Sequence, residues 1–200
     1  MATALAPRVY GLDAICAAAL QAAGGEDAAQ FARRLFGRVA DKDLAAASAD
    51  QRAAASNALL AFARRRLPGV AKVRVFNPTA GVHGFESRHT IVQIVNDDMP
   101  FLVDSLTVEL TRRRLGLHLI IHPVLAVRRD PSGRLLDLGA PTEVPDGVLE
   151  SFIHAEVDRQ SDPERLAALE DDLRRVLGDV RHAVTDWRAM HGKIEEVLGE

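Results

Sequence analysis

The sequence has few aromatic residues and a single cysteine. Aromatic side chains make up 4% of its 200 residues, so aliphatic side chains must supply most of the 48% that are hydrophobic. The lone Cys16 rules out an intramolecular disulfide, which fits a reducing compartment. Cys16 falls on the apolar side of an expected helix, so we interpret it as a buried, inert thiol rather than a reactive one.

Neither sign of charge dominates, and no long apolar run is present. The 25 Lys and Arg residues nearly balance 28 Asp and Glu residues, which argues against the strongly basic surface of a nucleic-acid binder. Every apolar run is far shorter than the ~20 residues that span a bilayer. The opening MATALAPRVYGLD lacks the basic segment of a secretory signal. We therefore expect a cytoplasmic protein without a membrane or nucleic-acid partner.

The motifs that mark common catalytic and cofactor sites are also missing. There is no GxGxxG between a strand and a helix, no P-loop, no GxSxG and no HExxH. The Gly81-Val82-His83-Gly84 segment is too short and in the wrong context to be a dinucleotide fingerprint. From these residues we expect no catalytic group, no cofactor and no metal in this chain.

The first third of the chain has the pattern of a helical subdomain. Apolar residues at helical spacing predict helices from about Val9 to Leu20, from Glu26 to Phe36 and from Asp50 to Leu67. The Pro68-Gly69 pair ends the third helix. We assign residues 1–69 to an N-terminal helical subdomain.

From Val70 onward the period changes to that of strands. Strands are predicted at residues 70–76, 89–95, 117–129 and 151–159, with a short one at 134–138 and a helix at 100–115. This order predicts an α+β fold over residues 70–178, a ferredoxin-like sandwich. Its sheet would have about four antiparallel strands with helices on one face.

A final helix is predicted from Pro163 to the end of the chain. Its apolar stripe continues through Gly178 and includes Trp187, which we interpret as a packing anchor. A small domain does not need so long a helix. We therefore expect residues 179–200 to form an extension leading to the rest of a longer chain.

Several separated motifs carry a resemblance to a known family. NDDMPFLVDS, HPVLAVRRD, ESFIHAEVDR and VRHAVTDW occur in this order between about Arg88 and Met190. They closely resemble the N-terminal region of the large bacterial NAD-dependent glutamate dehydrogenases. In that family this region looks like an ACT-type regulatory module, and catalysis belongs to a dehydrogenase domain much further along.

The resemblance implies a non-catalytic segment of a parent that converts L-glutamate, water and NAD to 2-oxoglutarate, ammonium and NADH. NAD would serve the parent, and the segment's partners would be later domains of that chain and further copies of itself. Two roles are open. The segment either senses an amino-acid effector or is a structural module without a ligand.

Resemblance to ACT modules also points to the loop before the helix at 100–115 as an effector site. Its residues are Asn96, Asp97, Asp98, Met99, Pro100 and Phe101. Backbone N–H groups at the helix start attract a carboxylate, and either aspartate could hold an ammonium group. Yet an N-cap at Asp98 and Pro100 in the first turn would explain both residues without a ligand. Phe101 replaces the glycine usual in ACT modules, so we favour a structural turn or domain contact.

Histidines on the predicted strands suggest an interface. His118 and His122 would lie about 13 Å apart at roughly 3.3 Å per residue, too far to share a metal ion. Strict alternation places Leu119, Ile121, Leu125 and Val127 on the helix-covered face. The opposite face would carry His118, Ile120, His122, Phe152, His154 and Glu156. Its mixture of polar and apolar residues predicts contact with a second copy, the helical subdomain or a later domain.

Two arginine triplets, Arg64–Arg66 and Arg112–Arg114, are each expected in the last turn of a helix. There they would stabilise the negative end of the helix dipole. An anion-binding role is the alternative.

Overall fold

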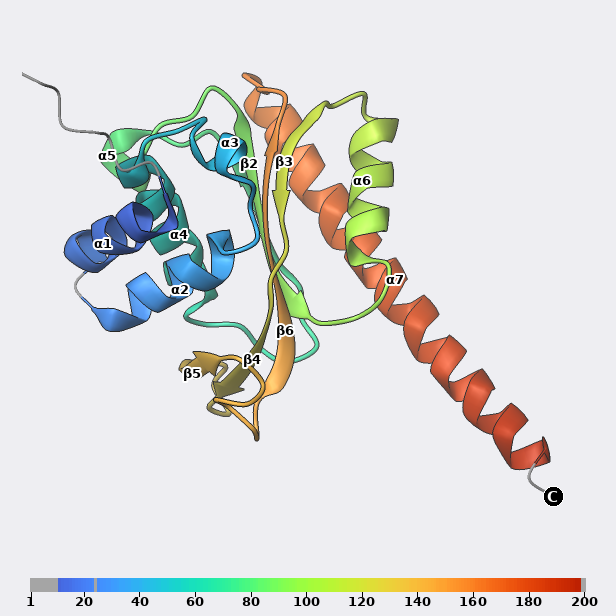
Figure 1. The fold of residues 1–200 in the computed structure, drawn as a ribbon. Helices are drawn as coiled ribbons and strands as arrows, with labels where there is room; N and C mark the ends of the chain where they lie inside the picture. Colours follow the sequence, from blue (N-terminus) through green and yellow to red (C-terminus); the bar gives the residue numbers. More distant parts are fainter. Residues whose placement is uncertain (1–10, 24, 199–200) are drawn as a thin grey trace, which may run out of the picture. The chain divides into compact units, whose positions relative to one another are not determined.

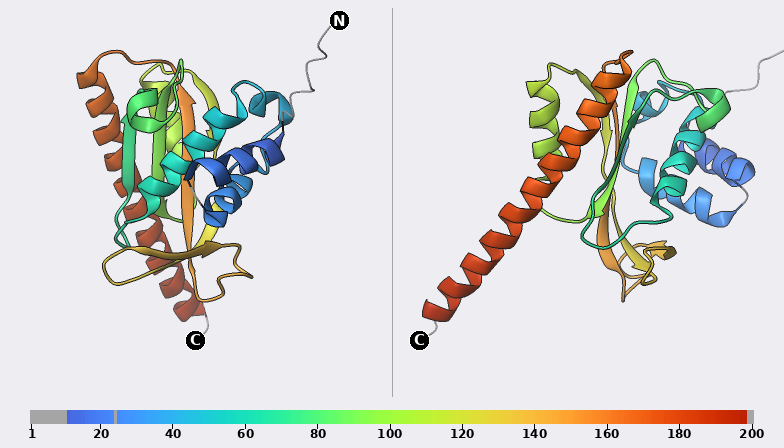
Figure 2. Two further views of the ribbon diagram at one scale, coloured as in Figure 1. Left: turned by 90° about the vertical axis from the view of Figure 1, so that its left-hand side faces the viewer. Right: turned by 180° about the vertical axis from the view of Figure 1, so that it is seen from behind.

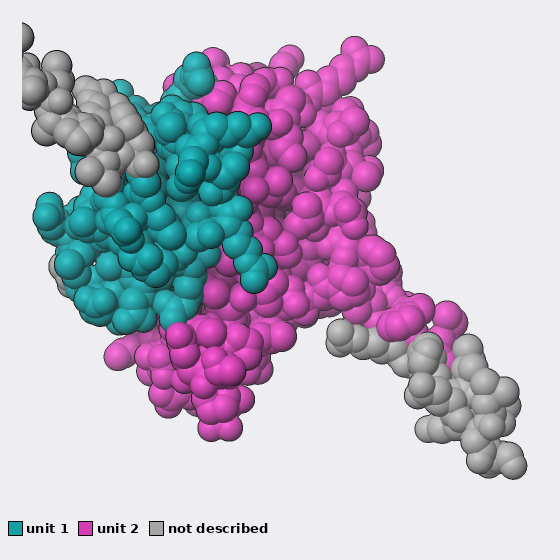
Figure 3. Space-filling model, in the orientation of Figure 1, with its two compact units in different colours: residues 1–64, 77–88 teal, residues 65–76, 89–200 magenta. Residues whose placement is uncertain are grey.

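The computed structural model describes residues 11–23 and 25–198. Contacts between residues divide the chain into two compact units, which are coloured separately in Figure 3. The first comprises Met1–Arg64 and Asn77–Arg88, and the second Arg65–Phe76 and His89–Glu200. Residues 77–88, expected as a loop of the second domain, therefore group with the helical segment that precedes residue 65.

The first unit is helical, as predicted. Its helices are α1 (Leu12–Ala23), α2 (Glu26–Phe36), α3 (Asp41–Leu44), α4 (Ala49–Ala63) and α5 (Ala80–His83). Helices α1, α2 and α4 pack on one another around buried Ile15, Phe31, Leu35, Phe36 and Leu59. The predicted helix start at Val9 lies outside the described residues.

Helix α4 is rich in alanine, and a capping box defines where it begins. The Ser48 hydroxyl accepts a hydrogen bond from the Gln51 N–H at 3.2 Å, and the Gln51 side chain accepts one from the Ser48 N–H at 3.2 Å. This capping box satisfies two N–H groups that a helix start leaves unpaired. The helix ends at Ala63, earlier than the predicted Leu67.

Cys16 lies in the core of this unit, where 6% of the residue is exposed. Burial raises the pKa of its thiol above the ordinary value, and the positive charge of Arg33 opposes that change only in part. A buried, protonated thiol is a poor nucleophile, which agrees with the prediction of an inert residue.

The second unit is a six-stranded sheet with two helices. The strands are β1 (Lys72–Phe76), β2 (Thr90–Asp97), β3 (Leu117–Ile121), β4 (Val124–Arg129), β5 (Leu135–Gly139) and β6 (Val148–Val157). Every pairing is antiparallel. The order is β1-β2-β6-β4-β5, and β3 also pairs with β6. Strands β2 to β6 are labelled in Figure 1. The α+β prediction is confirmed.

The sheet has six strands and not the expected four, because one predicted strand is interrupted and the short predicted strand, β5, also pairs in the sheet. The stretch Leu117–Arg129 divides into β3 and β4 at His122-Pro123. Proline has no N–H to donate to a neighbouring strand, which favours a break at this position. Its carbonyl still accepts a bond from the Phe152 N–H at 3.0 Å, so both halves stay beside β6.

Helices α6 (Leu102–Arg112) and α7 (Pro163–Leu198) cover the same face of the sheet (Figure 2). The core between them contains Val73, Val92, Ile94, Ile153, Ala155, Val157, Leu102, Leu106, Leu110, Leu169, Leu173 and Leu177. Each fully buried leucine here contributes about 2 kcal/mol of hydrophobic stabilisation. This confirms the prediction of helices on one face.

Helix α7 is a single helix of 36 residues, which at 1.5 Å per residue is about 54 Å long. The Asp162 carboxylate accepts from the Glu164 N–H at 2.9 Å and so caps its start. Among the α7 residues whose side chains are described, Val184 is the last buried one, and 57% of Trp187 is exposed. The predicted long helix is confirmed, whereas the prediction that Trp187 anchors the packing is wrong.

Despite that length, none of the helices in the described part of the chain is apolar enough over a sufficient span to cross a membrane.

The face alternation predicted for the stretch 117–129 is wrong, and one irregularity explains it. Leu117 lies opposite Val157, but Leu119 lies opposite Glu156, so the register shifts by one residue at His118. Such a bulge moves every following side chain to the other face. Ile120 consequently packs against the helix-covered core, not on the predicted interface face.

The shift persists into β4. Leu125 lies opposite Glu150 and Val127 opposite Val148, so both are on the face away from α6 and α7. The sequence pattern alone could not predict this change of face. Hydrophobic and polar residues continue to alternate on either side of a single bulge.

Candidate functional site

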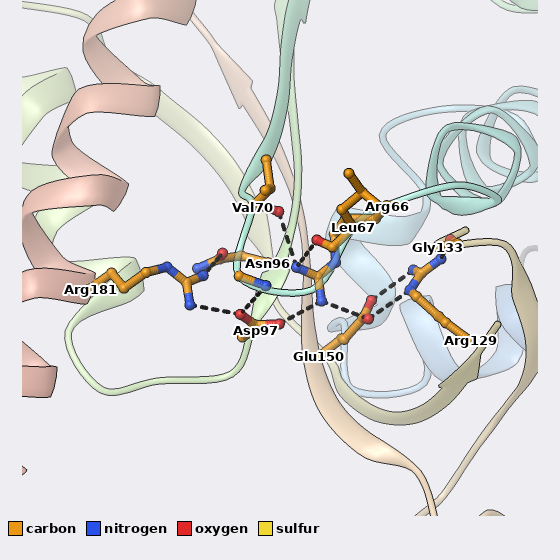
Figure 4. A network of polar contacts seen from close by, with 10 residues as sticks. Arg66, Leu67, Val70, Asn96, Asp97, Arg129, Gly133, Glu150 and Arg181 are labelled. Atoms are coloured by element: carbon orange, nitrogen blue, oxygen red, sulfur yellow. Dashed lines mark hydrogen bonds and ion pairs between the residues drawn. The ribbon is translucent and has the colours of Figure 1, made fainter. Parts of the chain in front are cut away.

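The predicted effector loop begins inside a buried network of ion pairs, shown in Figure 4. Asn96 and Asp97 are the last residues of β2, which pair with Ser151 and Glu150 of β6. The Asp97 carboxylate contacts Arg66 from the segment before β1 and Arg181 from α7. The base of the loop is thus connected to three other parts of the unit.

Glu150 is the centre of the buried side of this network. Its carboxylate is fully buried and accepts from the Arg66 guanidinium at 2.7 Å. Arg129 of β4 donates two bonds to the same carboxylate, at 2.7 and 2.8 Å, and a third to the Gly133 carbonyl at 3.0 Å. Two arginines in this geometry compensate the cost of burying the carboxylate.

Asp97 links the buried side to α7. One carboxylate oxygen accepts from Arg66 at 2.6 Å, and the other accepts from Arg181 at 2.7 Å and from the Gly69 N–H at 3.0 Å. Burial alone would raise the pKa of Asp97, but the bonds from Arg66 and Arg181 outweigh it and lower that pKa. The carboxylate is therefore charged and engaged, with little capacity left for a ligand ammonium group.

Asn96 completes the connection to α7. Its carbonyl oxygen accepts from Arg181 at 2.8 Å. Its Nδ2, and Nε of Arg66, are buried and have no partner among the described residues. The prediction that the first arginine triplet stabilises a helix end is wrong for Arg66, because α4 has ended and Arg66 binds two carboxylates instead.

Asp98 takes part in a second, smaller cluster and does not cap α6. Its carboxylate accepts from the Ser151 hydroxyl at 2.7 Å, and that hydroxyl lies 2.9 Å from Nε2 of His122. Its own N–H donates to the Leu149 carbonyl at 2.9 Å. The predicted N-cap role of Asp98 is wrong: the N-cap position of α6 is Phe101, which makes no side-chain cap bond.

His122 gives the cluster a pH dependence that can be measured. Burial lowers the pKa of His122 below its ordinary 6.5, and the charge of Asp98 opposes this only in part. As the pH falls through 6.5, the unfolded chain therefore binds the proton first. The free energy of unfolding should therefore decrease as the pH is lowered through this window, by at most about 1.4 kcal/mol per pH unit for one proton.

Denaturant titrations on either side of pH 6.5 will check this, with His122→Gln as the control that removes the titration while keeping a side-chain donor. The variant should show a shallower pH dependence than the parent sequence. Equal slopes would exclude His122 as the source.

The last three loop residues differ sharply in exposure. Met99 packs partly buried against the core under α6 and α7, whereas Pro100 is exposed. Phe101 is 63% exposed and has a φ of 69°, in the left-handed region. A bulky residue rarely adopts this conformation, and a glycine would adopt it without strain.

Phe101→Gly should therefore raise the free energy of unfolding by about 0.5–1 kcal/mol, as left-handed strain of about 1–2 kcal/mol is relieved and glycine's entropy offsets part of it. Phe101→Ala is the matched control, since it removes the ring but keeps the strained φ. Equal stability of the two variants would show that the ring, not the backbone, sets the effect.

The predicted interface residues do not form one uniform surface. Phe152 and His154 are buried, and Gln93 lies 3.2 Å from Nδ1 of His154. His118 is largely exposed and lies 2.8 Å from Asp158. Glu156 binds the ring of His89 at 3.0 Å. Contact of these residues with a second copy or a later domain stays a prediction.

Sequence reasoning missed Arg66, Arg129, Glu150 and Arg181 as members of the network. These residues are spread over more than a hundred positions, and single charges in strands and helices are normally solvated. Only the antiparallel register places Glu150 opposite Asp97. Glu150 lies just before the predicted strand 151–159, so the sequence pattern gave no signal that this carboxylate is buried.

The described residues do not form the strand–turn–helix unit with a glycine-rich turn that commonly binds a dinucleotide such as NAD. That unit is built on parallel strands, whereas the strand pairings of the described residues are antiparallel. Gly81 and Gly84 belong to the short α5 and its end, not to a turn after a strand. Over the described residues, no three His, Cys, Asp or Glu side chains are grouped to hold a metal ion.

Comparison with known proteins agrees with these features. A family model described as "Glutamate dehydrogenase, ACT1 domain" matches residues 31–173. The NAD-specific glutamate dehydrogenase of Halomonas elongata is 40% identical over 172 residues, which cover 85% of this chain and 11% of that protein.

Two further relatives carry the same name. The protein of Pseudomonas aeruginosa is 41% identical over 128 residues, covering 64% of this chain and 8% of the relative. That of Mycobacterium tuberculosis is 34% identical over 110 residues, covering 54% and 7%. The chain thus spans about a tenth of the length of these relatives or less. By the family match over most of its length, this chain belongs to the ACT1-domain family of glutamate dehydrogenases.

Proposed function

We propose that this chain is a non-catalytic regulatory or assembly segment of a large NAD-dependent glutamate dehydrogenase acting in the cytoplasm. The parent would convert L-glutamate, water and NAD to 2-oxoglutarate, ammonium and NADH. The names of the relatives support the parent activity. The antiparallel sheet, which does not suit a dinucleotide, supports a segment that regulates or assembles and does not catalyse.

One observation carries the regulatory proposal: Asp97 is bound by Arg66 on one side and by Arg181 of α7 on the other. A displacement of the loop that follows Asp97 would change both ion pairs at once. Because α7 is one continuous helix, a change at Arg181 would be transmitted along it to whatever it contacts. An effector that favours one arrangement of the loop would then shift the population of α7 positions.

The effector would be an amino acid whose carboxylate binds at the start of α6. The N-cap residue Phe101 makes no side-chain cap bond, so no such bond competes there with an anion for the N–H groups of the first turn. Asp98 is better suited than Asp97 to the ligand's ammonium group, since among the described residues Ser151 alone donates to the Asp98 side chain.

A purely architectural role is the second candidate. Both aspartates already have partners within the fold, and Phe101 occupies the position where a ligand would approach the backbone. In this case the segment would contact later domains or a second copy without binding a small molecule.

Calorimetric titration of the 200-residue chain with the common amino acids separates the two. Saturable binding that is lost in Asp98→Asn and strengthened in Phe101→Gly would support an effector site. No heat of binding with any of these amino acids, together with sedimentation that shows a dimer, would support the architectural role. Glutamate-dependent reduction of NAD by the chain alone would contradict the proposal that it is non-catalytic.

A further inference from the structure

A concave site lies at the end of α6 that is far from the predicted effector loop. A cavity of about 210 Å³ is lined by Arg113, Leu115, Gln160, Arg165 and Leu169. These residues come from the end of α6, the segment after β6 and the first turns of α7. The loop and the cavity are separated by the length of α6, which is about 17 Å for its 11 residues.

Arg113 is held in a fixed orientation at this cavity. Its Nε donates to Glu109 at 3.0 Å, and its Nη2 donates to the Ala168 carbonyl at 3.0 Å and to Asp172. Nη1 has no acceptor within the described part of the chain. The guanidinium is thus anchored through Nε and Nη2, while Nη1 is available to a ligand. A side chain that is already held in place loses less entropy on binding.

Arg165 supplies a second, exposed cation. Its side chain is 73% exposed, and its ion pair with Asp162 is long, at 3.7 Å. It can therefore turn towards an anion seated beside Arg113 without breaking a strong contact. Both charged residues that line the cavity are arginines, whose planar guanidinium groups suit carboxylate and phosphate oxygens.

The floor of the cavity is apolar. Leu169 is fully buried and Leu115 packs against the same core. The volume is below the ~300 Å³ at which drug-sized pockets begin. A ligand here would be small, with an anionic group and a few carbon atoms.

From this arrangement we infer that the cavity between the end of α6 and the start of α7 binds a small organic anion, a carboxylate or phosphate with a short apolar body. The anionic group binds Nη1 of Arg113 and the Arg165 guanidinium, and the apolar part lies on the partly exposed Leu115, with the buried Leu169 beneath it. This site is independent of the loop at residues 96–101 and of the function proposed for it.

The test is titration of the 200-residue chain with butyrate and with inorganic phosphate, followed by backbone amide NMR shifts. Uncharged butanamide serves as the matched probe. We expect saturable shifts at Gln160 and Leu169 with butyrate, phosphate or both, on the order of a millimolar dissociation constant, and none with butanamide. Butyrate alone would identify a carboxylate site, and phosphate alone a phosphate site.

Variants locate the interaction. Arg165→Gln, on an exposed side chain, should weaken binding on the order of tenfold, as expected for loss of a charge-assisted bond. Arg113→Lys keeps the charge but loses the fork and should also weaken it. Arg175→Gln, on α7 outside the cavity, and Phe101→Gly should leave it unchanged. Equal binding of butanamide, no saturable shift, or no effect of Arg165→Gln would overturn the inference.

Discussion

Replacing Arg129 by methionine will lower the free energy of unfolding by about 3–5 kcal/mol, the usual cost of removing one partner of a buried ion pair. Arg129 makes two of the hydrogen bonds to the Glu150 carboxylate, and both side chains are almost completely buried. Methionine preserves the packing of the side-chain stem, so the loss reports the uncompensated carboxylate.

The neighbouring Arg128→Met is the matched control. Arg128 pairs with Asp137 at 3.1 Å, but about half of each side chain is exposed. Exposed pairs of this kind contribute less than about 1 kcal/mol. Urea denaturation of both variants measures the difference. Equal losses at the two positions would show that the buried network has no special role in stability.

Gly133→Ala should have the second large effect, a loss of about 2–4 kcal/mol, from strain in the left-handed region together with overpacking. Gly133 has a φ of 81°, and a Cβ there would lie 2.4 Å from the Arg66 carbonyl oxygen. The Gly133 carbonyl also accepts from the Arg66 N–H at 2.9 Å and from Arg129. The substitution therefore displaces the two arginines that hold Glu150.

Gly69→Ala isolates the backbone contribution. Gly69 has a similar φ of 76°, but nothing lies within 4 Å of a Cβ built there. We expect this variant to lose only about 1–2 kcal/mol, the cost of the left-handed conformation itself. Thermal or urea unfolding compares the two. A loss at Gly133 no larger than that at Gly69 would contradict the predicted clash.

These stability effects bear on the regulatory proposal because Arg66 and Arg129 share the network with Asp97. If α7 responds to the loop through Arg181, then Arg181→Gln should uncouple the two with a smaller stability cost, since Arg181 is partly exposed. We therefore expect the Glu150 side of the network to stabilise the fold and the Arg181 side to transmit changes in the loop to α7.

The sequence by itself determined the helical and strand segments, the α+β class and the long last helix. Apolar spacing specifies which residues must be buried together, and capping residues such as Ser48 and Asp162 specify where helices begin. The motifs from NDDMPFLVDS to VRHAVTDW were sufficient to indicate the family, which the match over residues 31–173 establishes.

Tertiary structure alone decided the side-chain faces of β3 and β4 and the partners of the loop. A single-residue bulge at His118 reversed the predicted faces, because the period of a strand is two and a shift by one inverts it. The roles of Arg66 and Glu150 depend on contacts across 84 positions, which no local pattern encodes. Charges that a sequence suggests are solvated become buried only when the register brings their partners together.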